Sequence, residues 1–151
     1  MKDSVVKATV AGIIGAIIMD VVMYLFILLG VNTTAPWVIA ADVFLTPDSI
    51  YTAPGLILGV VGTVALNVAA AALTLFLCKL TGFDYAVLKV ILSTNAFGFV
   101  TIGLFMPLLK IAPQVQQQPV TNYLALLILS VIGAIQGYIL KKMSLRRLSR
   151  N

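Results

Sequence analysis

The chain has 151 residues, of which 61% are hydrophobic and only 10% are charged, whereas soluble domains carry roughly 25% charged residues. This composition excludes an ordinary soluble domain and predicts an all-α membrane protein, because lipid offers backbone amides no partner and the short alternating segments of a barrel are missing from the sequence. The formal charge of +5 comes with no histidine and one cysteine, which excludes an intrachain disulfide, the usual zinc sites and a Ser-His-Asp triad.

Four apolar runs are near or above the roughly 20 residues that a helix needs to cross a bilayer. They lie at about 5–30, 54–80, 85–111 and 122–140. We expect one transmembrane domain over 1–151, a bundle of four helices, with a basic tail at 141–151. The N-terminal segment begins with Lys2 and Lys7 and then turns apolar, but it is too long for the apolar region of a signal peptide, so it is interpreted as a retained span.

The connection between the first two spans is the longest in the chain and is predicted to contain a helix. Pro36 is a helix-start signal, and Pro47 ends the segment. We expect a short helix lying in the outer membrane interface, with Trp37 as its anchor at headgroup depth. A lid over a pathway is the alternative interpretation. Asp42 and Asp48 are expected to be solvated, and no metal or cofactor is predicted.

The basic residues fall almost entirely on one side of a four-span chain. They occupy the N-terminus, the second loop and the C-terminal tail, and are Lys2, Lys7, Lys79, Lys89, Lys141, Lys142, Arg146, Arg147 and Arg150. Only Lys110 borders the third loop. The positive-inside rule makes the basic side the cytoplasm, which predicts an N-in/C-in topology. We expect the tail to contact anionic lipid rather than nucleic acid.

Small and polar residues recur at intervals of four in the first two spans. In the first span this ridge is Ala8, Gly12, Ala16, Asp20 and Tyr24, and in the second it is Gly55, Gly59, Thr63, Asn67 and Ala71. Residues four apart stack along one side of a helix, and small side chains let two helix backbones approach closely. The ridges predict that these two spans pack on each other. Gly133 and Gly137 are further predicted packing positions in the last span.

Four polar side chains within the spans form a candidate site: Asp20, Asn67, Asn95 and Gln136. Asp20 and Asn67 lie near the middle of their spans and are expected to meet, while Asn95 and Gln136 fall nearer the cytoplasm and are expected to form a second layer. An interhelical amide contact contributes about 0.6 kcal/mol, whereas an aspartate at bilayer centre costs about 2.5–3.5 kcal/mol and often marks an ion path. Two roles therefore stay open for Asp20. It can be a hydrogen-bonded clamp that holds two helices together, or it can belong to a site that binds a proton or a cation.

Several features resemble the uncharacterised YqhR-like four-span membrane proteins of Firmicutes. They are Gly12 and Gly15 in the first span, the pair Pro36-Trp37, Pro107 and Pro113 around the end of the third span, and Gly133 to Gly137-Tyr138 in the last. The resemblance implies a multi-pass protein of a bacterial plasma membrane and supplies no activity.

Two functions therefore stay open. The first is a structural or accessory four-helix membrane subunit, which assembles with itself or within a larger complex. The alternative is a small oligomeric transporter or channel subunit with a proton- or cation-linked site at Asp20 and Asn67. No pair of nucleophile and base can be named in the sequence, so no enzymatic activity is expected.

Overall fold

The computed structural model describes residues 4–145 of the chain. It is 85% helical, without a strand in the described part, and four helical stretches are long and apolar enough to cross a membrane. These are α1 (Ser4–Leu28), α4 (Ala53–Thr81), a third stretch over Ala86–Leu109, and α7 (Pro119–Leu145). The prediction of an all-α protein with four candidate spans is confirmed, and the helix ends differ from the predicted ones by a few residues.

The third stretch is made of three consecutive segments. α5 (Ala86–Val100) is followed by η1 (Thr101–Phe105), which is a π-helical turn, and then by α6 (Met106–Leu109). The π turn ends at Phe105, two residues before Pro107, whose missing N–H removes one hydrogen bond of a regular helix. Lys110 adopts a left-handed conformation with φ 56° and ends the helix.

α7 continues beyond the end at residue 140 that the hydropathy predicts. Residues 141–145 form its last turn, because nothing between Leu140 and Leu145 is a glycine or a proline that would stop a helix. The first part of the predicted tail is therefore helical. Four basic residues behind the topology prediction lie outside the described residues: Lys2, Arg146, Arg147 and Arg150.

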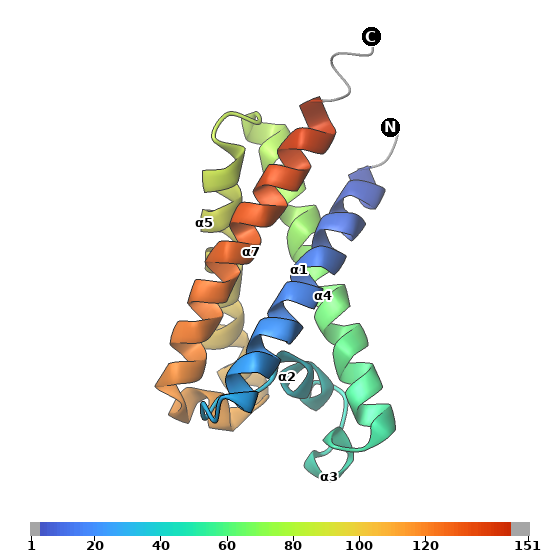
Figure 1. Cartoon of the computed structure of the whole chain (residues 1–151), viewed down its shortest axis with the longest axis vertical. Helices are drawn as coiled ribbons and strands as arrows, with labels where there is room; N and C mark the ends of the chain where they lie inside the picture. The colour runs from blue at the N-terminus through green and yellow to red at the C-terminus, as the bar shows by residue number, and fades with distance from the viewer. Residues whose placement is uncertain (1–3, 146–151) are drawn as a thin grey trace.

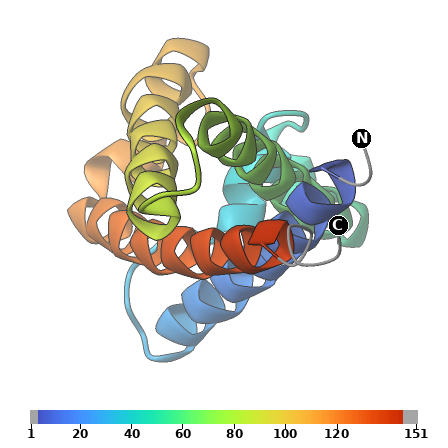
Figure 2. The same cartoon turned by 90° about the horizontal axis from the view of Figure 1, so that it is seen from above.

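The four long helices form two hairpins that pack together. α1 packs on α4, α5 packs on α7, and α7 also packs on α1, whereas α4 and α5 touch less. The start of α1, the end of α7 and the turn at 82–85 lie at one end of the bundle, here called the terminal end (Figure 1). From there α4 and α5 splay apart toward the opposite, loop end (Figure 2).

Two short helices of the first loop occupy the loop end. α2 (Pro36–Asp42) matches the predicted short helix, and α3 (Pro47–Ile50) is an additional one that the sequence pattern did not indicate. Both begin at a proline in the first turn, where the missing N–H costs no helical hydrogen bond. α2 packs on α4, and Ile39 of α2 also packs against the cluster of Met106, Ala112 and Val115.

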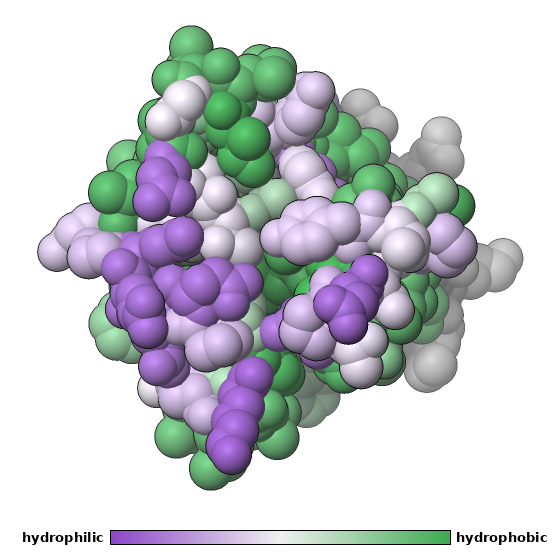
Figure 3. All heavy atoms as spheres, turned by 90° about the horizontal axis from the view of Figure 1, so that it is seen from below, coloured by the Kyte–Doolittle hydropathy of each residue, from purple (hydrophilic) through white to green (hydrophobic). Residues whose placement is uncertain are grey.

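Hydrogen bonds tie the first loop to the connection before α7, which contains the 3₁₀ turn η2 (Pro113–Gln117). Thr34 donates its hydroxyl to Gln118 Oε1 at 2.8 Å, and its amide to Thr121 Oγ1 at 3.3 Å. Asp42 accepts a hydrogen bond from the backbone N–H of Ala112. Asp42, which we expect from the sequence to be solvated, is partly exposed and also holds this connection in place. Figure 3, which views the molecule from the loop end, shows hydrophilic side chains gathered there.

The glycines of α1 and α7 lie where helix backbones approach most closely. A Cβ at Gly12 would come within 2.6 Å of the Val68 backbone nitrogen, so α1 touches α4 directly. On α7, a Cβ at Gly133 would meet Ile91 Cα at 2.8 Å, and one at Gly137 would meet Val87 Cα at 2.7 Å. Glycine at these positions permits the α1–α4 and α5–α7 contacts.

The part of the α4 ridge near the loop end, at Gly55 and Gly59, does not pack on α1 as predicted. A Cβ at Gly55 would overlap the backbone of Ser49 and Ile50, and one at Gly59 would overlap the backbone of Trp37. These two glycines therefore pack on the first loop, and the prediction that they face the first span is wrong. The physical reason is the divergence of α1 and α4 toward the loop end, where α2 and α3 take the place of α1 (Figure 1).

Candidate intramembrane polar site

The carboxyl group of Asp20 bridges α1 and α4 through a threonine. Thr63 Oγ1 lies 2.9 Å from Asp20 Oδ2 and donates to it, and it also lies 2.9 Å from the carbonyl oxygen of Val60. The second carboxyl oxygen, Oδ1, is buried and has no hydrogen-bond partner within residues 4–145. Asp20 as a whole is half-buried on the flank of the α1–α4 pair.

Asn67 reaches Asp20 only indirectly. Its Nδ2 donates to the carbonyl oxygen of Thr63 at 3.0 Å and lies 3.9 Å from the sulfur of Met19. The sequence predicts that Asp20 and Asn67 meet, and the structure joins them through Thr63, which contacts both. The Nδ2 group of Asn67 is directed at Thr63 and Met19, and Thr63 is the only observed partner of the Asp20 carboxyl group in the described residues.

Gln136 lies at the contact of three helices and is completely buried. Its Nε2 donates to the carbonyl oxygen of Ala11 on α1 at 3.3 Å, and its Oε1 has no partner in the described part of the chain. A Cβ added to Gly15 would lie 2.5 Å from Gln136 Nε2 and 3.1 Å from Asn67 Oδ1. Gly15 therefore leaves room beside α1 for both amide groups, one from α4 and one from α7.

Asn95 belongs to a separate contact, between α5 and α7. Its Nδ2 donates to Ser130 Oγ and to the Ile91 carbonyl oxygen, both at 2.9 Å. The predicted second layer of Asn95 with Gln136 is therefore wrong. The two residues lie at different heights of the α5–α7 pair, because Asn95 is level with Ser130, whereas Gly137, next to Gln136, packs on Val87. Gln136 also faces α1 rather than α5.

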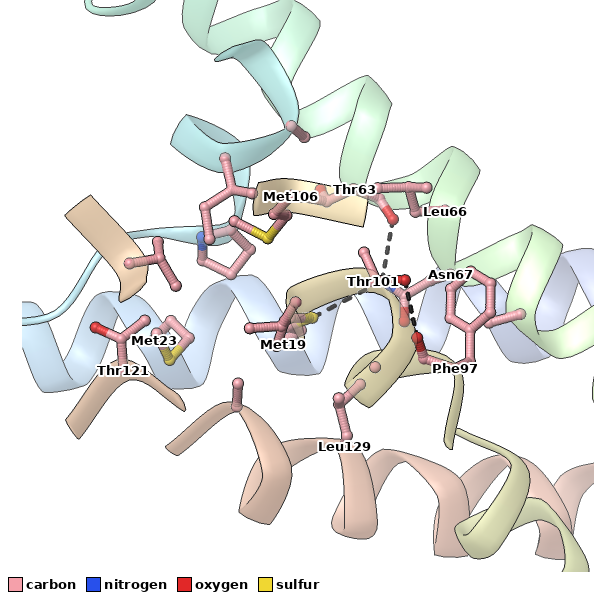
Figure 4. A pocket seen from close by; sticks show the side chains of 18 of the residues that line it. Met19, Met23, Thr63, Leu66, Asn67, Phe97, Thr101, Met106, Thr121 and Leu129 are labelled. Atoms are coloured by element: carbon pink, nitrogen blue, oxygen red, sulfur yellow. Dashed lines mark hydrogen bonds between the residues drawn. The ribbon is translucent and has the colours of Figure 1, made fainter. Parts of the chain in front are cut away.

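A cavity of about 130 Å³ lies between the two hairpins in the half of the bundle near the loop end. By the same measure a water molecule needs about 10–15 Å³, so several would fit. Met19 and Met23 of α1, Thr63 and Asn67 of α4, and Phe97 of α5 all line it (Figure 4). α2 closes it toward the loop end with Pro36, Ile39 and Ala40.

The cavity reaches the flank of the bundle between α4 and α5. Leu66 of α4 lines it and is 45% exposed, and Phe97 of α5 lines it and is partly exposed. Toward the terminal end a dense core fills the bundle, consisting of Ala8, Ala11, Ala71, Leu75, Cys78, Ala86, Val90 and Leu140. The cavity is therefore a blind recess that opens sideways.

Thr94 of α5 also lines this recess and differs from the other helical threonines. Thr74 and Thr101 each donate their hydroxyl to a backbone carbonyl of their own helix, and Thr63 has both Asp20 Oδ2 and the Val60 carbonyl oxygen within 2.9 Å. Thr94 is only 2% exposed, and its hydroxyl has no partner in the described residues. No sequence signal separates Thr94 from those threonines.

Trp37 packs on both helices of the first hairpin. Its backbone lies against Gly59 of α4, and its ring centroid is 6.3 Å from that of Tyr24 on α1 with the planes tilted by 53°. These contacts fix α2 to the bundle.

No group of three or more potential metal ligands occurs within residues 4–145. Comparison of the chain with protein-family models, curated proteins and solved structures finds no match.

Proposed function

We propose that the protein is a structural or accessory four-helix membrane subunit without enzymatic activity. The observation that carries the proposal is the position of Asp20, whose carboxyl group accepts a hydrogen bond from Thr63 across the α1–α4 contact and does not line the cavity. Asn95 and Gln136 likewise bond between helices. Polar groups used in this way hold helices in register, and the bundle would assemble with itself or within a larger membrane complex.

The proposed setting is a bacterial plasma membrane, with the terminal end in the cytoplasm. Lys79 donates to Ser4 near the start of α1, and Lys89 donates to the carbonyl oxygens of Thr81 and Gly82 at 2.9 and 3.0 Å. These contacts gather basic groups at the terminal end, which supports an N-in/C-in topology by the positive-inside rule. In this setting α2 lies in the outer interface, Trp37 is its anchor, and the basic tail contacts anionic lipid.

Reporter fusions test this topology. We expect fusions after Thr81 and after Lys142 to report a cytoplasmic location, and fusions after Asp48 and Gln117 to report the outer side. The reason is the excess of lysine and arginine at the terminal end. A cytoplasmic signal from the Gln117 fusion, with an outer signal from the Lys142 fusion, would contradict the proposed orientation.

One observation favours a transporter or channel subunit as the second candidate. Thr63 both donates to Asp20 and lines the cavity, so the acid is one hydrogen bond away from space that water can fill. Asp20 Oδ1 also lacks a partner in the described residues. An acid in such a position can bind and release a proton or a cation. Because the recess ends blindly at the terminal core, this function would need an oligomer or a second conformation.

Ion flux in liposomes separates the two candidates. We expect the purified wild type to carry no proton or cation flux above that of empty liposomes under a pH gradient or a membrane potential. We expect Asp20→Asn, which keeps the size of the side chain and removes its charge, to fold and to behave identically. Asp48→Asn, the same change at an exposed position of α3, is the matched control. Flux that Asp20→Asn abolishes and Asp48→Asn preserves would overturn the structural proposal.

A further inference from the structure

The recess between α4 and α5 has the chemistry of a ligand site rather than of a packing defect. None of the side chains that line it within residues 4–145 is charged, so it suits an uncharged molecule. Three of them are the methionines Met19, Met23 and Met106, whose flexible side chains adapt to apolar ligands of different shape. A cavity of comparable size lined by apolar side chains binds benzene in an engineered protein.

The inner wall of the recess carries a hydroxyl without a partner. Thr94 is 2% exposed, and its Oγ1 makes no hydrogen bond in the described residues. A helical threonine normally has the carbonyl oxygen of the preceding turn available, and Thr101, seven residues further along the chain, donates to that of Phe97 at 2.8 Å. Buried polar groups in proteins are nearly always paired. A ligand with one hydrogen-bonding group would give the Thr94 hydroxyl the partner that it lacks in the described residues.

The access to the recess also limits the kind of ligand. Leu66 and Phe97 stand at its side opening on helices that are long and apolar enough to cross a membrane. Toward the loop end α2 covers the recess, and toward the terminal end the core closes it. A molecule dissolved in the bilayer therefore reaches the recess sideways, between α4 and α5.

We propose that this recess binds an uncharged, bilayer-dissolved molecule with an apolar body and one hydroxyl or carbonyl group, which hydrogen-bonds to Thr94. This binding is independent of ion flux and of the role of Asp20, so it can hold or fail separately from the proposed structural function. The size of the recess, about 130 Å³, admits a short alkyl or single-ring compound, or one end of a longer lipid.

Photolabelling of the whole protein in phosphatidylcholine vesicles tests the proposal. The probe is an octanol that carries a diazirine, and the comparison probe is the octane with the diazirine at the same carbon. We expect saturable octanol labelling of peptides from α4 and α5 that line the recess. Thr94→Val keeps the shape of the side chain and removes the hydroxyl, so it should weaken octanol binding by about 2–10-fold, the ratio that one hydrogen bond produces. Octane binding should not change.

A second pair of variants tests the location. Ala70 of α4 lines the recess and is buried, whereas Ala69 is exposed on the flank of the same helix. Ala70→Leu fills part of the space and should abolish saturable labelling, and Ala69→Leu should leave it unchanged. Labelling that never saturates, or that is equal in wild type and Ala70→Leu, would overturn the site. Equal octanol affinity in wild type and Thr94→Val would overturn the role of the hydroxyl, and this variant remains informative if Ala70→Leu does not fold.

Discussion

Replacement of Gln136 by alanine is expected to lower the free energy of unfolding by about 2–5 kcal/mol, the range seen when a large buried side chain is truncated. Gln136 is completely buried and fills the space at Gly15 where α1, α4 and α7 meet. Alanine would leave a void there and would remove the bond to the Ala11 carbonyl oxygen. Unfolding of the purified protein in detergent, followed by circular dichroism, measures the effect.

Gln136→Leu is the control that separates volume from polarity. Leucine restores most of the volume, and Gln136 Oε1 already lacks a partner in the described residues, so we expect a loss of less than about 1.5 kcal/mol. If the leucine variant is as unstable as the alanine variant, the hydrogen bond to Ala11 carries the contact, and the packing account of Gln136 fails.

Gly12→Ala is expected to destabilise the bundle by about 1–3 kcal/mol, the usual cost of overpacking. The added methyl group would overlap backbone atoms of Val68, and a backbone cannot rotate away as a side chain can. α1 and α4 would have to move apart, which would lengthen the hydrogen bond between Asp20 and Thr63. The measurement is the midpoint of thermal unfolding in detergent.

Gly103→Ala is the matched control for Gly12→Ala. A Cβ at Gly103 meets no atom within 4 Å, and alanine has a higher helix propensity than glycine by about 1 kcal/mol. We therefore expect this variant to be as stable as the wild type or more stable. Equal destabilisation by the two substitutions would show that helix contacts do not depend on Gly12.

The four spans are predictable from sequence because hydropathy over about 20 residues is a strong signal. The short helix α2 is also predictable, since Pro36 and Pro47 mark its neighbourhood. The packing of α2 on α4 cannot be predicted in the same way, because hydropathy says nothing about how far α1 and α4 diverge. The glycine spacing of four therefore correctly indicates close contacts at Gly12, and gives the wrong neighbour for Gly55 and Gly59.

The sequence predicts which residues form the polar site, but it does not predict which of them contact each other. A polar residue in an apolar run stands out, so Asp20, Asn67, Asn95 and Gln136 are found by inspection. Pairing depends on the rotation of each helix and on the register between neighbouring helices, and this register places Asn95 beside Ser130 and Gln136 beside Ala11. Thr63 is identified in the sequence only as a packing position, because a threonine in an apolar helix gives no sign that it donates to an acid.

A double-mutant cycle between Asp20 and Thr63 tests most directly whether Asp20 is a clamp between α1 and α4. The free energy of unfolding in detergent is measured for wild type, Asp20→Ala, Thr63→Val and the double variant. We predict a coupling energy of about 0.6–1.7 kcal/mol, the range for interhelical hydrogen bonds in membranes. The control cycle pairs Asp20→Ala with Thr74→Val, a buried threonine on α4 that donates to its own helix, and should give a coupling within about 0.5 kcal/mol of zero. The same near-zero coupling for Asp20 and Thr63 would contradict the clamp.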